Sequence, residues 1–138
     1  FPTTLAEDVN GGDTAKAVLL NGEGLVIRVL VLTVWTVDTR CTLAWDRARG
    51  FQEQLQAKYG STFGRVETAE IGEFLCSMHL ADKSRAWHLV WDTGEVVVGL
   101  SMGGSETGVG TRLTLAYEDE ALLEAWTEDR LRREREAL

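Results

Sequence analysis

LVIRVLVLTVWTV, the stretch from Leu25 to Val37, contains the longest apolar run of the chain, and Arg28 is the only charge in it. Its β-branched residues fall on both odd and even positions. This pattern is typical of a central strand covered on both faces, or of a strand in an oligomer interface. The run is far shorter than the roughly 20 apolar residues of a membrane-spanning helix, so it predicts a strand and no membrane insertion.

A shorter apolar run, Ala15–Leu20, precedes this strand, and Asn21-Gly22-Glu23-Gly24 separates the two. An Asn-Gly pair readily adopts the positive φ angles of a tight hairpin turn. The two runs therefore predict a β-hairpin. The polar residues 1–14 ahead of it are expected to form a mobile end.

The period of the apolar residues changes after this strand. Steps of four, three, four and four residues separate one set of apolar side chains, which is the spacing of one face of an α-helix. The set consists of Ala44, Ala48, Phe51, Leu55 and Tyr59. Gly60 follows at once and suits a helix C-terminus. We therefore expect a packed helix near residues 43–59.

Several short extended segments are expected after this helix. They are Phe63–Ala69, Glu73–Leu80, Arg85–Trp91, Glu95–Ser101 and Thr111–Tyr117. Residues 119–137 are expected to form a last helix, with acidic residues first, basic residues last and an apolar stripe of Leu122, Leu123 and Trp126. The chain therefore predicts a single α+β domain over residues 1–138, with a mainly antiparallel sheet of five to seven strands and these two α-helices.

The composition describes an ordinary folded chain with an acidic balance. Of its 138 residues, 44% are apolar and 26% are charged, which fits a single globular domain. Fourteen basic residues against 22 acidic residues give a net charge of -8, a balance that repels phosphate backbones and anionic lipid head groups. We therefore expect a protein partner or a small apolar ligand, and no nucleic acid. The chain begins at Phe1 in place of methionine, so a segment is expected to have been removed upstream.

Asp92-Thr93-Gly94 matches the catalytic tripeptide of aspartic proteases, in which two aspartates share a proton. A chain with one copy would have to work as a homodimer. Here the tripeptide joins two apolar segments, where Asp and Gly are ordinary turn residues. Retroviral-type proteases also need most of their length after the motif, and too little follows Gly94. A turn is therefore the preferred interpretation, and a hydrolase that uses Asp92 is kept as an alternative.

The stretch Gly103–Gly110 resembles a phosphate-binding loop but lacks its chemistry. Val109 stands where such a loop needs a lysine, and a strand is expected where a helix should follow. A mobile loop is the preferred interpretation, with Glu106 as a candidate partner-binding residue. His79 and His88 are the only histidines, and they lie in no recognisable zinc-ligand spacing, so we expect no metal site and no other cofactor.

The two cysteines, Cys41 and Cys76, lie in different predicted elements. In an oxidising compartment they could form a disulfide that stabilises the fold by roughly 3 to 4 kcal/mol. In a reducing compartment they would remain small buried thiols. The sequence leaves both states open.

Five tryptophans are a generous number for a chain of this length. The plain interpretation is a core between the sheet and the helices. The functional interpretation is an aromatic pocket that binds a ligand between Trp87, Trp91 and Trp126. Trp45 lies just off the stripe of its helix, which makes it a candidate exposed contact for a partner.

Three stretches resemble a family of small bacterial proteins. They are Leu55-Gln56-Ala57-Lys58-Tyr59-Gly60, then Ala86-Trp87 with Glu95-Val96-Val97-Val98, and finally Leu113-Thr114-Leu115-Ala116-Tyr117-Glu118-Asp119. Their order is similar to that of mostly uncharacterised exported or lipoprotein-type domains, and the resemblance covers residues 25–120. It implies a bacterial α+β domain that is periplasmic or exported rather than cytoplasmic, and it supplies no catalytic residue.

No acid–base pair, activated nucleophile or metal-ligand set can be assembled from these motifs. We therefore expect a non-enzymatic binding or interaction module, for example an exported inhibitor or immunity-type protein. A homodimer is compatible with the sequence. The alternative is a small-molecule-binding domain whose tryptophan-lined pocket lies between the sheet and a helix.

Overall fold

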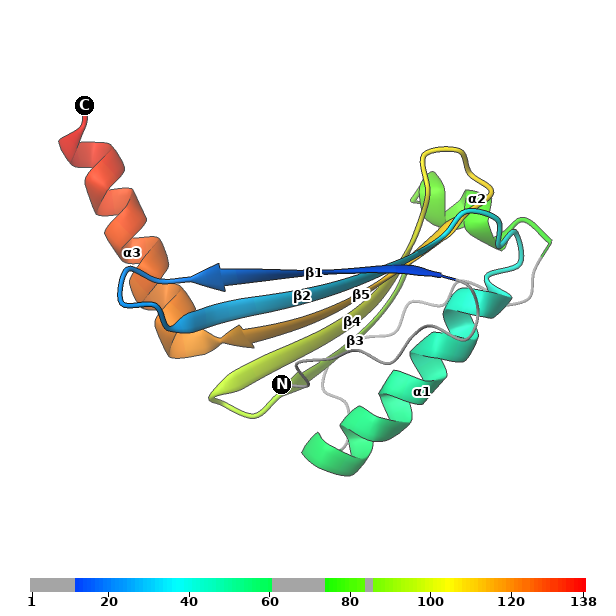
Figure 1. Ribbon diagram of the computed structural model, residues 1–138, viewed down its shortest axis with the longest axis horizontal. Helices are drawn as coiled ribbons and strands as arrows, with labels where there is room; N and C mark the ends of the chain where they lie inside the picture. The colour runs from blue at the N-terminus through cyan, green and yellow to red at the C-terminus, as the bar shows by residue number, and fades with distance from the viewer. Residues whose placement is uncertain (1–11, 61–73, 84–85) are drawn as a thin grey trace.

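The computed structural model describes residues 12–60, 74–83 and 86–138. In these residues one antiparallel sheet has the strand order β1-β2-β5-β4-β3, and three helices accompany it (Figure 1). The elements are β1 (Asp13–Leu20), β2 (Val26–Trp35), α1 (Thr42–Tyr59), α2 (Cys76–Ala81), β3 (Trp87–Asp92), β4 (Val96–Gly104), β5 (Thr111–Asp119) and α3 (Glu120–Glu136). The predicted α+β class with an antiparallel sheet is confirmed.

The predicted β1–β2 hairpin forms, although neither Asn21 nor Gly22 has the positive φ expected of the Asn-Gly pair. The Asn21 side-chain oxygen accepts the backbone N–H groups of Glu23 and Leu25, at 2.9 and 3.0 Å. Gly24 has a φ of +80°, a left-handed conformation that glycine adopts without steric cost. Because β1 begins at Asp13, the strand reaches into the predicted mobile end, of which residues 1–11 lie outside the described part of the chain.

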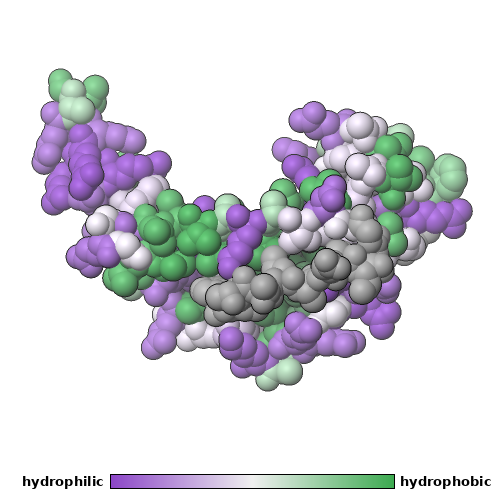
Figure 2. Space-filling model, viewed as in Figure 1, coloured by the Kyte–Doolittle hydropathy of each residue, from purple (hydrophilic) through white to green (hydrophobic). Residues whose placement is uncertain are grey.

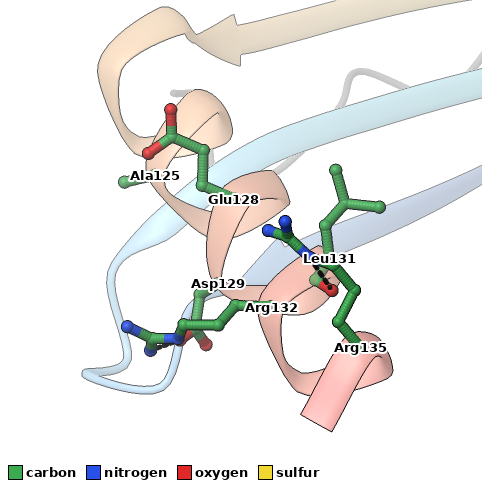
Figure 3. A pocket seen from close by; sticks show the side chains of 6 residues that line it. All are labelled: Ala125, Glu128, Asp129, Leu131, Arg132 and Arg135. Atoms are coloured by element: carbon green, nitrogen blue, oxygen red, sulfur yellow. Dashed lines mark hydrogen bonds and ion pairs between the residues drawn. The ribbon is translucent and has the colours of Figure 1, made fainter. Parts of the chain in front are cut away.

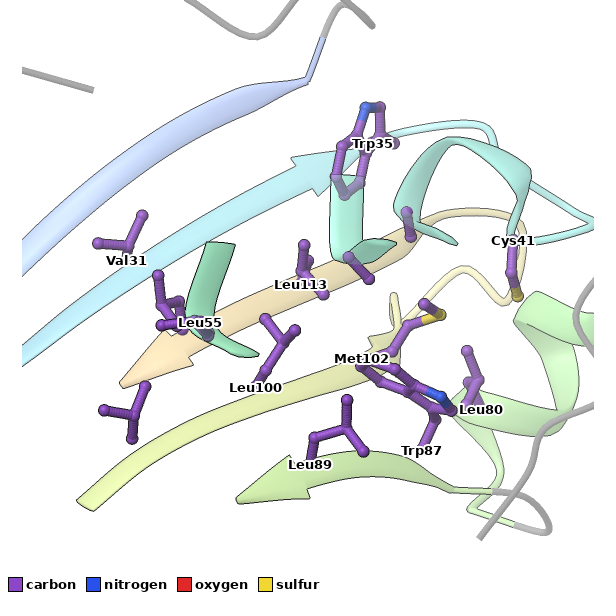
Figure 4. Close-up of a cluster of buried hydrophobic side chains, with 14 of the residues drawn as sticks. Val31, Trp35, Cys41, Leu55, Leu80, Trp87, Leu89, Leu100, Met102 and Leu113 are labelled. Atoms are coloured by element: carbon purple, nitrogen blue, oxygen red, sulfur yellow. The ribbon is translucent and has the colours of Figure 1, made fainter. Parts of the chain in front are cut away.

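α1 covers one face of the sheet and forms the core there (Figure 4). Three residues of its predicted stripe, Ala44, Ala48 and Leu55, are buried. Phe51 and Tyr59 are partly buried against the same cluster. The facing sheet residues alternate along each strand, as expected for a sheet buried on one side. They include Ile27, Val29, Val31 and Trp35 on β2, Trp87, Leu89 and Trp91 on β3, Val98, Leu100 and Met102 on β4, and Leu113 and Leu115 on β5.

The opposite face of the sheet is open in the described part of the chain (Figure 1). The residues of β2 that point to this face, Leu30, Leu32 and Val34, are half-buried, whereas their neighbours on the α1 side are buried. The described residues therefore cover β2 on one face and not on both. The other expectation for this strand, a place in an oligomer interface, stays a prediction.

α3 begins directly after β5 and leaves the sheet (Figure 1). Asp119 caps it, because the Asp119 carboxylate accepts the backbone N–H of Leu122 at 2.9 Å. The expected packing of α3 into the core is wrong: Leu122, Leu123 and Trp126 are only half-buried, and the helix has no buried residue. The reason is that α3 contacts β2 and β5 at the end of the sheet instead of lying along a face.

Most of Glu73–Leu80, which the apolar residues predict to be extended, belongs instead to the short helix α2 (Cys76–Ala81), and Glu73 lies outside the described residues. Alternation over so few residues is a weak signal. Tertiary contacts decide the conformation, because Cys76 is bonded to Cys41 and Ser77 hydrogen-bonds to distant loops. The expected strand Phe63–Ala69 lies outside the described residues. The remaining predicted strands are confirmed, with ends displaced by a few residues.

Candidate functional site

Exposed apolar side chains gather at the end of the molecule where α2 lies (Figure 2). Their exposed fractions range from 40% to 69%, and they come from the β2–α1 loop, from α2 with the residues before it, and from the β4–β5 loop. They are Val37, Phe74, Leu75, Met78 and Val109. We call these five residues the apolar tip. Apolar surface left in water is unfavourable, and a group of such residues marks a candidate contact surface.

A disulfide joins two of the three segments that carry the tip. Cys41 in the β2–α1 loop and Cys76 at the start of α2 are bonded, with a sequence separation of 35. Both residues are buried. Closing a loop of this length restricts the unfolded chain and stabilises the fold by about 4 kcal/mol. Of the two redox states that the sequence leaves open, the structure contains the bridged one.

Three hydrogen bonds fix the same segments against one another. The N–H of Ser77 donates to the carbonyl oxygen of Thr39 at 3.1 Å, and its hydroxyl donates to the carbonyl oxygen of Gly108 at 2.7 Å. The N–H of Asp38 donates to the carbonyl oxygen of Val109 at 2.7 Å. Ser77 is 1% exposed, so its bonds are shielded from water. The tip is therefore one fixed surface and not three independent loops.

Asp38 fastens the β2–α1 loop to the helix and to the sheet. Its buried carboxylate accepts the N–H groups of Leu43 and Ala44, each at 3.0 Å, and the hydroxyl of Thr111 at 2.7 Å. Those two N–H groups lie in the first turn of α1, where the helix offers them no partner. Cys41, directly before α1, has a φ of 62° and gives no side-chain cap, so Asp38 takes this role.

Two glycines of the predicted loop Gly103–Gly110 permit close packing around the tip. A β-carbon on Gly104 would lie 2.4 Å from the Ala81 nitrogen, and one on Gly110 would lie 2.4 Å from the Trp35 carbonyl oxygen. The first contact lets α2 rest on β4, and the second brings the β4–β5 loop against the end of β2. These two glycines permit close packing. The predicted loop begins too early in the sequence, because Gly103 and Gly104 belong to β4, and its mobility stays a prediction.

The β4–β5 loop itself is a compact turn. The N–H of Ser105 donates to the carbonyl oxygen of Gly110 at 3.1 Å, and the Ser105 hydroxyl oxygen accepts the N–H of Gly110 at 3.0 Å. Gly108 has a φ of +77°, which favours glycine. Glu106, the predicted partner contact, is exposed in this turn, three positions before Val109 of the tip.

The predicted aromatic residues lie in different layers of the fold. Trp87 and Trp91 are 4% and 1% exposed and belong to the core under α1. Trp45 is half-buried and packs edge to face on Trp87, with ring centroids 5.8 Å apart. Trp126 is half-buried on α3, where the Arg130 guanidinium lies 5.2 Å from its ring centroid. The structure thus brings Trp45 and Trp87 together and places Trp126 outside that core.

Asp92 lies at the exposed end of β3 and has the geometry of a turn residue. Its carboxylate accepts the N–H of Gly94 at 2.9 Å, and Gly94 has a φ of +85°. Glu120 at the start of α3 lies beside it. Partial burial, followed by the charge and hydrogen bond of Asp92 and the charge of Glu124, raises the pKa of Glu120 above its ordinary value. The preferred interpretation of the tripeptide, a turn between two strands, matches this arrangement.

Two surface hollows are lined by none of the tryptophans. The larger has a volume of about 580 Å³ and lies along α3, which supplies its whole lining (Figure 3). The smaller, of about 100 Å³, lies at the end of the sheet and is lined by Val26, Ile27, Val96, Tyr117, Glu118 and Asp119. Ligand pockets usually enclose several hundred Å³ between elements. The first hollow is open along a single helix and the second is small, so neither has the form of such a pocket.

The histidines and the acidic residues form no metal cluster in the part of the chain that the structure describes. His79 lies on α2 and His88 on β3. Among the described helices, none has the length and apolar character to cross a membrane.

Comparison with known proteins offers no parallel for this geometry. No protein-family model matches the chain, and no curated protein and no solved structure matches it. The resemblance to small exported bacterial domains therefore stays a prediction.

Sequence reasoning missed most of the residues that form and hold the tip. Asp38 and Ser77 are polar residues whose role depends on partners far along the chain. Phe74 and Met78 belong to an apolar stretch that the alternation rule assigns to a strand. The useful signal was Cys76, because a bridge from this residue to the start of the first helix would have placed the stretch beside the β2–α1 loop.

Proposed function

We propose that this chain is a non-enzymatic interaction module that binds a protein partner through the apolar tip. The observation that carries the proposal is that the tip residues are exposed while the groups that hold them are buried. The buried Cys41–Cys76 disulfide, Ser77 and Asp38 hold the three segments that carry the apolar tip. Covering exposed apolar surface is favourable, and a surface that is already ordered loses little conformational entropy on binding.

The charges beside the tip suggest how a partner would be oriented. The Arg40 guanidinium lies 5.7 Å from the ring centroid of Phe74, and both residues are exposed. Glu106 is exposed in the turn that carries Val109. A partner that presents apolar side chains, an acidic group toward Arg40 and a basic group toward Glu106 would match both. Such rim charges mainly set orientation and association rate.

The disulfide supports a location outside the reducing cytoplasm. Structural disulfides persist in periplasmic, secreted and surface proteins, where the surroundings are oxidising. A periplasmic or exported location is therefore part of the proposal. A fixed apolar contact surface suits an exported inhibitor or immunity-type protein. The alternative of a small apolar ligand held by tryptophans stays a prediction.

Two serine variants of matched exposure test the proposal. Met78 in the tip is 48% exposed, and Leu131 on α3 is 45% exposed. Tagged wild-type, Met78→Ser and Leu131→Ser chains are incubated with extract of the source cell, and the captured proteins are quantified by mass spectrometry. We expect a partner that the wild-type and Leu131→Ser chains capture alike and that Met78→Ser captures at least about fivefold less. Equal capture by all three chains would show that the tip is not the contact surface.

A further inference from the structure

In the described part of the chain, β1 is an edge strand that no helix covers on either face. Seven of its eight residues are exposed, and the remaining one, Leu19, is half-buried. On the α1 side of the sheet, Val18 is 47% exposed, although Val29 beside it on β2 is 3% exposed. Within the described ranges, β1 has β2 along one edge and no strand along the other. The outer edge of β1 therefore offers backbone N–H and C=O groups to a further strand.

β1 has only two of the features that keep edge strands apart, namely Lys16 and a register shift against β2 between Leu19 and Leu20. The strand contains no proline, and Lys16 is the only charge after its first residue. Val18 and Leu20 are 47% and 49% exposed, so a second strand would cover apolar side chains as well as backbone groups. Such an edge is a template for an identical strand.

The sequence of β1 selects one register for pairing with its own copy. In an antiparallel pair, two residues that lie opposite each other point to the same face of the sheet. A two-fold axis normal to the sheet leaves each side chain on its own face. The axis must therefore pass between one residue and the same residue of the other copy. A centre at Lys16 or Ala17 gives the longest overlap, and the Ala17 centre runs from Thr14 to Leu20. The Lys16 centre places two ammonium groups side by side, which is unfavourable. The Ala17 centre places Lys16 opposite Val18 and two small residues at the axis.

We propose that two copies of this chain associate through antiparallel β1 strands, with the two Ala17 residues at the axis, to form one continuous sheet. In this register Ala15 lies opposite Leu19 and Thr14 lies opposite Leu20, so both faces of the new strand pair cover apolar atoms. The tip lies at the opposite end of the sheet from the β1–β2 turn (Figure 1). The dimer therefore carries its two tips at opposite ends, and it forms whether or not the tip binds a partner.

Sedimentation velocity of the full chain over a concentration series up to about 100 µM tests the dimer, since one strand pair makes a small and weak interface. We expect the wild-type chain to shift from 15.3 kDa toward twice that mass. Ala17→Glu and Ala17→Lys each place like charges at the axis, so each should weaken the dimer at least about tenfold. An equimolar mixture of the two variants places glutamate opposite lysine and should restore the dimer.

Ala57→Glu is the matched control, because Ala57 is an exposed alanine on α1, and this variant should dimerise as the wild-type chain does. Three results would overturn the proposal: a monomeric wild-type chain at every concentration, Ala17→Glu dimers as tight as those of Ala57→Glu, or a mixture that stays monomeric. Circular dichroism of the Ala17 variants checks that they are folded.

If Met78→Ser and not Ala17→Glu abolishes the dimer, the copies meet through their tips and the β1 pairing is wrong. The capture of a partner by the tip is measured separately, with the Met78→Ser and Leu131→Ser chains.

Discussion

Replacing Gly104 by alanine is expected to push α2 away from β4 and to disturb the apolar tip. The added β-carbon would lie 2.4 Å from the Ala81 nitrogen and 2.5 Å from the Ser77 carbonyl oxygen, whereas β-carbons essentially never come within 3.0 Å of such atoms. Both are backbone atoms, so no side-chain rotation relieves the contact. α2 must therefore move by about 0.6 Å to remove the overlap and by about 1 Å to reach an ordinary contact, because interiors are close-packed.

This movement acts on the hydrogen bonds that hold the tip. Ser77 donates to Gly108 at 2.7 Å and to Thr39 at 3.1 Å, and a displacement of about 1 Å takes both out of good geometry. Two weakened bonds at about 1 kcal/mol each, together with about 1 to 2 kcal/mol of overpacking strain, predict a loss of about 3 to 4 kcal/mol in the free energy of unfolding.

Urea unfolding measures this loss, and Gly103→Ala is the matched control on the same strand. The nearest atom to a β-carbon on Gly103 is an Arg112 side-chain nitrogen at 3.7 Å, which is an ordinary contact. Gly103→Ala should keep the wild-type stability or gain up to about 1 kcal/mol, because alanine restricts the unfolded chain. If Gly104→Ala proved as stable as Gly103→Ala, the close seating of α2 on β4 would be refuted, and with it the rigidity of the tip.

Three further expectations concern the groups that hold the fold. Replacing Cys41 and Cys76 together by alanine should lower the free energy of unfolding by about 4 kcal/mol, and an unchanged urea midpoint would contradict this. Asp38→Ala removes the acceptor of four donors, of which the Thr42 hydroxyl at 3.5 Å is the most distant, and should cost about 3 kcal/mol, whereas Thr111→Val removes one donor and should cost about 1 kcal/mol. Equal losses in urea unfolding would contradict the role of Asp38 in joining the β2–α1 loop to the helix and the sheet. The pKa of Glu120 is raised above 4.5 in the fold, so folding favours the protonated carboxyl group. The contribution of Glu120 to stability is therefore present at low pH and is lost as the pH rises through the folded pKa. Glu120→Gln should therefore be more stable than the wild-type chain at neutral pH but not below pH 4.5, and an equal gain at both pH values in urea unfolding would point to another cause.

The hairpin and the first helix were predictable because their signals are local. Asn21 and Gly24 close the turn with contacts inside four residues, and the α1 stripe needs nothing beyond a period of 3.6. The open face of the sheet and the direction of α3, in contrast, have no local signal in the sequence. Leu122 and Trp126 have helical spacing whether or not a sheet lies beneath them, so the pattern could not tell that α3 leaves the body.

The tip could not be predicted because tertiary contacts create it. α2 has six residues, and its conformation is fixed by the bond from Cys76 to Cys41 and by the contacts of Ser77 with loops far along the chain. Val109 is exposed because Gly108 and Gly110 fold the β4–β5 loop into a compact turn. Exposure of this kind is a property of the folded chain, and spacing in the sequence does not encode it directly.

The dissociation constant of the captured partner, measured by titration with purified chains, tests the central claim most directly. Met78→Ser should raise this constant at least about tenfold, because it removes apolar contact area at the tip. Leu131→Ser, with nearly the same exposure on α3, should change it by less than about twofold. Equal weakening by both variants, or no weakening by Met78→Ser, would contradict a partner surface built on the disulfide-held tip.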